Sequence, residues 1–486
     1  MTTQLPQKKY FVFYYDNQYL CSMEEMVTIS RLEYEQLKRE NAAFRCEIDH
    51  LRTIVQQLEA TISLMKGSKN SRTSSLAPSH DLARSNTISL RVPSGKKSGG
   101  QVGHTGHSLQ MVDTPDEIID HTPDVCECCG ESLANVESAS FTRRQIVDIP
   151  PVKPLYIEHR SHIKICPFCA LSNQGLFPEG VQSPIQYGPQ VEAMTGYLSV
   201  YQSLPYARIA QLFRDFFKLS LSEGTIDNFL ERLSNKATGV YEMIRERIQS
   251  SEVVGSDETG CRVNGKKHWF HVWQTRFLTF IVSFPSRGYK VIEKYFEDGF
   301  IHSFYISDCW LSQLKVKARK HQLCMAHLLR ELTNFAENLG SEWSAKMKGL
   351  FMCALELKKK MTQDDYIHPP QEVDKLEAEL DELLKTDYTK FHPKEQAFIK
   401  RLIKHRQSIF TFLKHLNVPP DNNASERAIR NVKVKTKVSG QFRNEQGKGA
   451  DRYAKIRSVI DTTVKNGQDI FSALVCMANC KYNPYT

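Results

Sequence analysis

Two pairs of cysteines with the same spacing constrain the fold of this chain more than any other feature. Each pair has the pattern Cys-x-x-Cys, and a longer spacer (130–165) separates them: Cys126, Cys129, Cys166 and Cys169. A two-residue gap lets one turn direct both sulfurs at the same ion, and two such turns complete a tetrahedral zinc site. Because four thiolates leave no open position, we expect one structural zinc ion per chain. The alternative is four ordinary buried cysteines.

The rest of this cysteine-rich region is expected to be a small β module. The segments 140–149 and 155–165 are predicted to form strands between the two pairs, and Cys128 is interpreted as a bystander inside the first pair. Gly130 and Pro167 are turn residues of the kind that such knuckles use.

Composition limits the cellular compartment and the class of partner. No apolar stretch reaches the ~18 residues that a membrane span needs, and the N-terminus shows no signal-peptide pattern, so we expect a cytoplasmic protein with reduced cysteines. The chain has 486 residues, of which 41% are hydrophobic, and a net charge of +9. The chain is long enough to form several domains, each with its own hydrophobic core. Its positive net charge favours polyanionic partners.

A heptad pattern precedes the cysteines. Apolar residues alternate at spacings of three and four: Tyr34, Leu37, Phe44, Ile48, Leu51, Val55, Leu58, Ile62 and Met65. Ser30 with Glu33 resembles a capping box, Gly67 ends the pattern, and Asn41 at an a position favours a parallel pair. We therefore predict a coiled-coil homodimer over 31–66. A single amphipathic helix packed on its own chain is the alternative.

Residues 67–103 are rich in Ser, Gly, Lys and Arg and show no apolar period, so they are predicted to be a flexible basic linker. His104 and His107 follow in a glycine-rich run. They are suited to binding metal or phosphate, but no further ligand lies close by in the sequence, and an exposed loop is the simpler interpretation.

Helices are predicted across 186–250. Segments 206–218 and 223–235 are separated by a short break, which fits a helix-turn-helix that places its second helix in a DNA groove. Ordinary packing of two helices explains the same pattern.

After residue 250 the pattern changes to three strands, a helix and a fourth strand: 251–257, 266–275, 277–284, 288–299 and 304–308. Asp257 is predicted to end the first strand and Asp308 the fourth. Carboxylates at strand ends project into a crevice of an α/β sheet and are able to share a metal ion. Each Asp is also an ordinary residue for a strand end.

Three features follow this α/β segment. Cys324 and His327 form a Cys-x-x-His pair, which is half of a zinc site by spacing or else a core cysteine with a nearby histidine. Residues 335–418 are predicted to be a helical insertion. Asn422 or Asn423 then begins a helix with Glu426 in its first turns, where the simplest role of Glu426 is a capping pair with Asn423.

The helix that begins near Asn422 continues into a basic, glycine-spaced segment that suits a phosphate backbone or a solvated surface. The candidate DNA-binding residues are Arg427, Arg430, Lys433, Lys435, Lys437 and Arg443, with Lys448 further along.

The ordered set of zipper, GGQVGHTGH, two Cys-x-x-Cys pairs, SDET, ISD, Cys-x-x-His, NNASERAIR and KVSGQFRN resembles the transposases of the bacterial insertion sequence 66 family, which are Asp-Asp-Glu recombinases. The resemblance covers about residues 30 to 475. It implies a ribonuclease-H-like α/β domain interrupted by the helical insertion, and a catalytic triad at Asp257, Asp308 and Glu426. Where the family often has Gly and an aromatic residue after the second Asp, Cys309 and Trp310 stand here.

The resemblance also implies cofactors and partners. Two magnesium or manganese ions at the triad would support cleavage of element ends and strand transfer, and no protein nucleophile is required. The partners would be double-stranded DNA of the terminal repeats and target, a second copy of the chain, and possible companion proteins, in a bacterial cytoplasm near the nucleoid. Glu258 is predicted to point away from Asp257 on the same strand.

Two alternatives come from other classes: a domesticated, catalytically inactive zinc-containing DNA-binding regulator, and a metal-dependent nuclease without strand transfer. The resulting fold class is multidomain α+β. Its expected parts are an N-terminal extension (1–30), the zipper (31–66), the linker (67–103), a zinc-binding DNA-binding module (104–185), a helix-turn-helix-like region (186–250), a catalytic domain (251–450, with its insertion at 335–418) and a helical tail (451–486).

Overall fold

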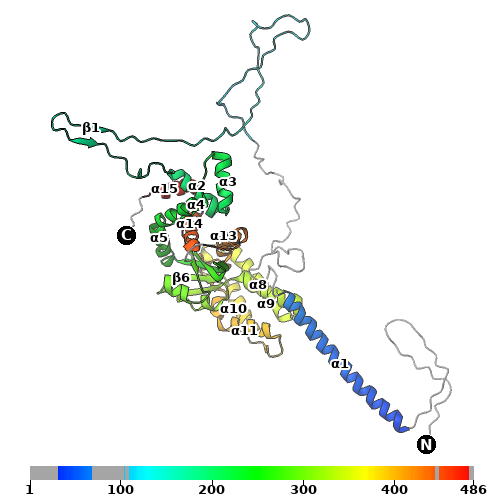
Figure 1. Cartoon of the computed structure of the whole chain (residues 1–486). Helices are drawn as coiled ribbons and strands as arrows, with labels where there is room; N and C mark the ends of the chain where they lie inside the picture. Colours follow the sequence, from blue (N-terminus) through cyan, green and yellow to red (C-terminus); the bar gives the residue numbers. More distant parts are fainter. Residues whose placement is uncertain (1–30, 68–102, 104–108, 444–447, 481–486) are drawn as a thin grey trace.

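The computed structural model describes residues 31–67, 103, 109–443 and 448–480, and Figure 1 shows the arrangement of their elements. The predicted N-terminal extension, nearly all of the predicted linker, His104 and His107 lie outside the described residues. None of the described helices is long and apolar enough to cross a membrane.

The first described element is one long helix, α1 (Arg31–Gly67), as the heptad pattern predicts. The helix extends away from the remainder of the protein, and its C-terminal end meets α8 (Figure 1). Its apolar side chains are exposed, with Leu37 at 54%, Phe44 at 61% and Leu51 at 52%. A row of exposed apolar side chains along a helix indicates a surface made for another helix.

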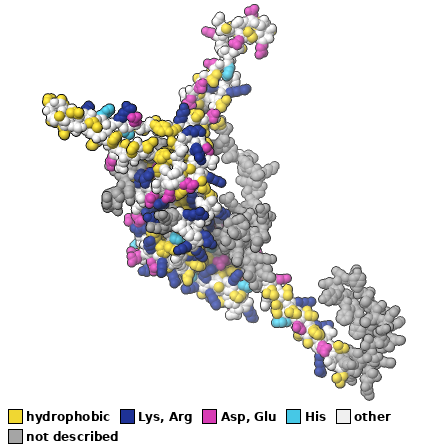
Figure 2. All heavy atoms as spheres, viewed as in Figure 1, with side chains coloured by type: hydrophobic (Ala, Val, Ile, Leu, Met, Phe, Trp, Pro, Cys, Tyr) yellow, Lys and Arg dark blue, Asp and Glu magenta, His cyan; other side chains and the backbone are white. Residues whose placement is uncertain are grey.

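The cysteine-rich region contributes little regular structure. Its one hairpin pairs β1 (Ile163–Ile165) with β2 (Ser172–Gln174). The predicted strands at 140–149 and 155–165 are therefore wrong except for the last three residues of the second. The physical reason is the lack of a local core, since Phe141 and Phe168 are 82% and 97% exposed and no partner sheet covers them. Figure 2 shows hydrophobic side chains along the arm that carries β1 and along α1.

Five helical segments follow and confirm the predicted helices: α2 (Pro189–Gly196), the π-helical turn η2 (Tyr197–Tyr201), α3 (Tyr206–Phe217), α4 (Glu223–Lys236) and α5 (Thr238–Gln249). Lys218 ends α3 in the left-handed region, and the Ser222 side chain caps α4 by accepting from the Thr225 amide at 3.0 Å.

The predicted helix-turn-helix corresponds to α3 and α4, and its second helix, α4, packs mainly in the protein core. Phe229 and Leu233 of α4 are buried, and the half-buried carboxylates Asp227 and Glu231 pair with Arg452 of α14 at 2.8 and 2.9 Å. Two faces of α4 are therefore used for packing within the protein. This arrangement favours ordinary packing over a helix-turn-helix.

A five-stranded mixed sheet forms the centre of the protein. Its strands are β3 (Val253–Val263), β4 (Lys266–Gln274), β5 (Thr279–Phe284), β6 (Phe300–Ser307) and β7 (Ala318–Leu323), in the order β5-β4-β3-β6-β7. The first three strands are antiparallel, whereas β6 runs parallel to β3 and β7 parallel to β6. The short helices α6 (Lys290–Tyr295) and α7 (Leu311–Leu314) lie before and after β6.

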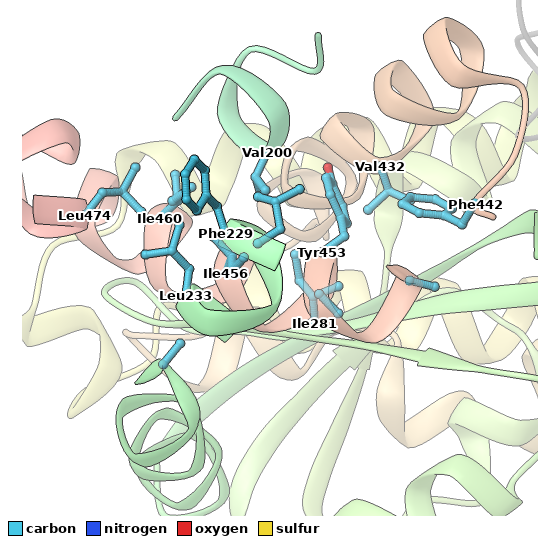
Figure 3. Close-up of a cluster of buried hydrophobic side chains, with 14 of the residues drawn as sticks. Val200, Phe229, Leu233, Ile281, Val432, Phe442, Tyr453, Ile456, Ile460 and Leu474 are labelled. Carbon is cyan, nitrogen blue, oxygen red and sulfur yellow. The ribbon is translucent and has the colours of Figure 1, made fainter. Parts of the chain in front are cut away.

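Helices cover both faces of this sheet. On one face α13 (Asn423–Ser439) and α14 (Lys448–Lys465) join α2, α4 and α15 (Ile470–Asn479) in a hydrophobic cluster. Figure 3 shows Ile281 of β5 in this cluster with Val432 of α13, Tyr453 of α14 and Leu474 of α15. On the other face a second cluster joins α5 and α6 to Trp273 and Tyr305.

The predicted helical insertion is confirmed as helical but is not detached from the sheet. It contains α9 (Glu342–Lys360), the turn η3 (Asp364–Tyr366), α10 (Gln371–Leu384), α11 (Pro393–Lys404), the turn η4 (Arg406–Ser408) and α12 (Thr411–Lys414), after α8 (Met325–Leu339). These helices share one hydrophobic cluster with Phe304 of β6 and Leu323 of β7. The insertion therefore braces the β7 edge of the sheet.

Candidate active site

Asp257 lies in the middle of β3, so the prediction that it ends the first strand is wrong. The strand continues to Val263 and returns as β4 through a turn in which Asn264 and Gly265 have φ of 48° and 76°. Asn-Gly is the dipeptide most typical of such a hairpin turn, and the sequence carries it at 264 and 265. β3 pairs with parallel β6 only up to Gly255, so Asp257 lies just past the end of that pairing.

The neighbouring carboxylate, Glu258, faces the other side of β3, as the alternation of strand side chains predicts. It is buried, pairs with Arg287 at 2.7 Å and accepts a hydrogen bond from the Gln313 side chain at 2.8 Å. These contacts give Glu258 a structural role on the α6–α7 face.

Asp308 directly follows β6, as predicted. Its Oδ1 accepts a hydrogen bond from the Trp310 amide at 3.0 Å, which fixes the carboxylate in the turn before α7. Because β3 and β6 are adjacent and parallel, their carboxyl-terminal ends lie at the same edge of the sheet.

Glu426 reaches the same region because α13 lies along β3. At its start, the Asn422 side chain donates to the Ser256 carbonyl at 2.5 Å and accepts from Ser425 Oγ at 2.6 Å. At its end, Phe442 exchanges backbone hydrogen bonds with Arg262 and Asn264.

Gly255 makes the close approach of α13 to β3 possible. A Cβ at this position would lie 2.6 Å from Ser425 Oγ and 2.8 Å from Asn422 Oδ1, so any larger residue would push the helix away. The start of α13, where Glu426 follows Ser425, is thereby held next to the strand that carries Asp257.

The contacts of Glu426 exclude the simple capping interpretation. Asn422, not Asn423, precedes the helix and makes no side-chain cap, while the Glu426 carboxylate contacts α8. Arg330 NH2 donates to its two oxygens at 3.2 and 3.3 Å, and His327 Nδ1 lies 3.6 Å from Oε1.

Electrostatic interactions relate Asp308 both to Asp257 and to the histidine that contacts Glu426. Burial, followed by the negative charges of Glu258 and Asp308, raises the pKa of Asp257 well above its usual range, and Lys433 opposes this. Burial and Arg330 lower the pKa of His327, against the charges of Glu426 and Asp308. Asp308 therefore lies close enough to influence both Asp257 and the histidine that contacts Glu426.

Among the described residues the three carboxylates do not form a donor group within 4.8 Å, but Asp257 and Asp308 lie near the end of β6, where two acidic side chains suit a hard divalent cation. Carboxylate oxygens are the ligands that magnesium prefers, and a cation would relieve the repulsion that raises the pKa of Asp257. The residues present at the edge of the sheet fit this group by donor type and charge.

The basic residues predicted to bind DNA divide into three groups. Arg427, Arg430, Lys437 and Arg443 are exposed. Lys433 is half-buried and its charge acts on Asp257, which places a cation beside the carboxylates. Lys435 is buried at 7% exposure and donates to the carbonyls of Ser199 and Leu204, so its assignment as a DNA-binding residue is wrong. The reason is helical periodicity, since Lys435 shares the buried face of α13 with Ala428 and Val432.

The burial of Lys435 predicts a pH-dependent stability. Burial lowers the pKa of Lys435 to about 8 from 10.5, so between these values the unfolded chain binds more protons than the folded one and stability rises with pH. In Lys435→Met this contribution is lost. The increase in the free energy of unfolding from pH ~7.5 to ~9.5 is expected to be about 2 kcal/mol smaller than in wild type, as measured by denaturant titration. Lys437→Met, at an exposed neighbouring site, serves as the control. Identical pH profiles for the two variants would contradict this account.

Both cysteine pairs adopt the same local geometry. In each turn the amide four residues after the first cysteine donates to that cysteine's carbonyl at 2.9 Å, from Gly130 in one pair and Ala170 in the other. Both of these residues have positive φ. Backbone amides inside the turn, foremost those of Cys129 and Cys169, lower the pKa of Cys126 and Cys166 respectively. Thiols that already accept backbone hydrogen bonds are suited to become metal-bound thiolates.

The structure does not bring the two pairs together. In the part of the chain that the structure describes, the four sulfurs do not form a donor cluster within 4.8 Å, whereas Cys324, His327 and Glu426 do. The sequence predicted the first two members as a pair and Glu426 as a catalytic carboxylate, but not the contacts of Glu426 with this pair and with Arg330. No local signal relates them, because Arg330 and Glu426 are 96 positions apart.

Two family models match this chain. The family model described as "Transposase IS66 family" matches residues 184–450, and the model described as "zinc-finger binding domain of transposase IS66" matches residues 123–170. The first match spans the sheet and all three carboxylates, and the second spans both cysteine pairs. No curated protein matches the chain. The chain therefore belongs to the IS66 family of transposases.

Proposed function

We propose that the protein is a DNA transposase in which Asp257, Asp308 and Glu426 support metal-dependent cleavage of element ends and strand transfer. The observation that carries this proposal is that Asp257 of β3 lies just past the pairing with β6, which Asp308 follows, and that the start of α13, which carries Glu426, is hydrogen-bonded to β3. The influence of Asp308 on both Asp257 and His327 supports it.

The sheet order supports a ribonuclease-H-like domain. The antiparallel strands β5, β4 and β3 are followed in the sheet by the parallel strands β6 and β7, and the part of β3 that carries Asp257 lies beside the end of β6. The helix that follows the insertion then supplies the third carboxylate from one face.

The carboxylates would hold two divalent ions, which stabilise the attacking and leaving oxygens of an in-line displacement at phosphorus. Lys433 lies near Asp257 and is available to neutralise a DNA phosphate that enters the site. Arg330 contacts Glu426 and holds this carboxylate in place, and it becomes a second phosphate contact once the carboxylate turns to a metal.

DNA affinity is assigned to the exposed basic side chains of the 427–443 segment and to the zinc module, which belongs to the family's zinc-finger domain. Phosphate contacts by Lys and Arg are independent of base sequence, so the recognition of element ends requires further contacts.

Dimerisation through α1 completes the proposal, because two DNA ends must be held together for transposition. The exposed apolar row of α1 would be buried in a parallel two-stranded coiled coil, with Asn41 paired to its partner copy.

Leu51→Pro is expected to abolish self-association of the full chain. A proline in a helix interior removes a hydrogen bond and clashes with the preceding turn, at a cost of about 3 kcal/mol or more. Sedimentation measures the change from dimer to monomer. Arg52→Ala replaces the next residue, which is exposed and outside the heptad seam, and should leave the dimer intact. A monomeric wild-type protein at high micromolar concentration would contradict the zipper.

Incubation of the purified protein with duplex DNA carrying the element's own ends and magnesium tests the function. We expect cleavage at the ends and, with target DNA, joined products. Binding without cleavage would indicate a domesticated regulator, and cleavage without joining would indicate a nuclease.

A further inference from the structure

A second kind of metal site lies beside the proposed triad. Cys324, His327 and Glu426 each offer one donor atom, and these atoms all lie within 4.8 Å of one another. Cys324 precedes α8, His327 lies in the first turn of α8, and Glu426 lies in the first turn of α13. One sulfur, one nitrogen and one carboxylate oxygen therefore converge from two helix starts.

Backbone hydrogen bonds hold these helix starts together. The Cys324 amide donates to the Ser307 carbonyl at 2.9 Å, and the Met325 amide donates to the Pro420 carbonyl at 3.0 Å. Cys324 Sγ itself accepts from the Asn422 amide at 3.2 Å. The cysteine is thus fixed to the segment that leads into α13, so the donors keep their relative positions without an ion.

His327 carries an unused nitrogen at this site. Its Nδ1 is buried and has no hydrogen-bond partner among the described residues, although it lies 3.6 Å from Glu426 Oε1. An unpaired buried polar atom costs about 1–3 kcal/mol. An ion between the two side chains would satisfy this nitrogen.

The donor set selects the type of ion. Thiolate and imidazole ligands favour zinc and related transition metals, whereas magnesium takes oxygen ligands. Zinc bonds of about 2.0–2.3 Å place tetrahedral ligand atoms roughly 3.5 Å apart, so donors within 4.8 Å need only a small inward shift. The His327 and Glu426 side chains are 31% and 24% exposed, which leaves one side open for a fourth ligand.

We propose that Cys324, His327 and Glu426 bind a zinc-like transition-metal ion, and that this ion inhibits DNA cleavage by withdrawing Glu426 from the triad. Binding releases the thiol proton of Cys324 to solvent and displaces Arg330, which otherwise holds both oxygens of Glu426. The site is separate from the four-cysteine module. Its inhibitory effect rests on the proposed function, but its existence does not.

Counting zinc ions in the full-length protein tests the site. After equilibration in zinc-buffered solution, wild type is expected to hold one more ion per chain than His327→Gln and Cys324→Ala, as measured by elemental analysis. Cys353→Ala removes an exposed cysteine of α9 and should match wild type. The four-cysteine module should contribute the same number of zinc ions to wild type and to each of the three variants. The histidine is partly exposed, so His327→Gln keeps the test valid if loss of the buried cysteine disturbs folding.

Cobalt provides an independent readout. In wild type the absorption of bound cobalt should include a contribution that His327→Gln lacks, since the ligands of this site differ from four thiolates. Equal zinc counts and equal cobalt spectra in wild type and His327→Gln would overturn the site.

The inhibitory effect is measured as the ratio of magnesium-dependent cleavage with and without zinc. Zinc should suppress cleavage by wild type and leave the ratio for His327→Gln near one. Equal suppression in both proteins would overturn the inhibition. A protein that never cleaves DNA would contradict the proposed function, while the ion count alone upholds or overturns the site.

Discussion

Replacement of Asp257 by asparagine is expected to lower magnesium-dependent cleavage by at least about 1,000-fold, because the metal ions that Asp257 is proposed to hold would lower the barrier by several kcal/mol. Asn keeps the shape of the side chain and can still accept the hydrogen bond from the Glu258 amide, which Asp257 Oδ1 accepts at 2.8 Å. DNA affinity should stay close to wild type, because it depends on the basic surface. Cleavage of labelled duplex and gel-shift titration measure the two quantities.

A matched control distinguishes the active-site carboxylate from any acidic side chain. Asp298 lies exposed in the turn before β6, and Asp298→Asn removes the same charge without touching the site. Its cleavage rate should equal that of wild type. Undiminished cleavage by Asp257→Asn would refute the triad.

Asp257→Asn should be more stable than wild type in metal-free buffer at neutral pH. Burial and neighbouring charges raise the pKa of Asp257 well above 3.8, so the folded state binds this proton more tightly than the unfolded state. Stability is therefore lost as the pH rises through the raised pKa, and asparagine avoids this loss. Magnesium should raise the Tm of wild type more than that of the variant. A variant less stable than wild type would instead indicate that its inactivity comes from misfolding.

Loss of one zinc ligand is the second large effect. Cys126→Ser is expected to lower the zinc content by one ion per chain and to make residues 109–186 sensitive to protease. Structural zinc contributes about 10–16 kcal/mol of apparent binding free energy, which is also folding free energy for a small module. None of the described residues at 109–186 belongs to one of the three hydrophobic clusters. Burial of apolar side chains therefore contributes little to the stability of this region.

Cys128 offers a closely matched control. It lies between the two ligands of the first pair and is exposed, and the hydrogen bonds of the turn do not depend on its sulfur. Cys128→Ser should keep the wild-type zinc content and protease resistance. The same loss of zinc in both serine variants would mean that Cys128 takes part in the site, and no loss in either would contradict the four-cysteine assignment.

The turns of the cysteine pairs and most of the regular elements follow from nearby residues. A knuckle depends on a few consecutive residues, and α1 and the strands β4 to β6 depend on periodic patterns within one segment. The same local information placed Asp308 after a strand. The predicted strand end at Asp257 was wrong, although the Asn-Gly turn at 264 and 265 that extends β3 is itself a local signal.

The sequence by itself determined the turns of the two cysteine pairs, the long N-terminal helix, the strand-rich centre and the family resemblance, because each depends on spacing along the chain. Only the tertiary structure decided that Lys435 is buried, that the insertion shares a core with the sheet, and that Glu426 meets Cys324 and His327. The physical reason is that burial and electrostatic contact depend on distance in space. The contacts that fix α13 between β3 and α8 join Asn422 to Cys324 across 98 positions and to Ser256 across 166 positions, and no local pattern specifies either contact.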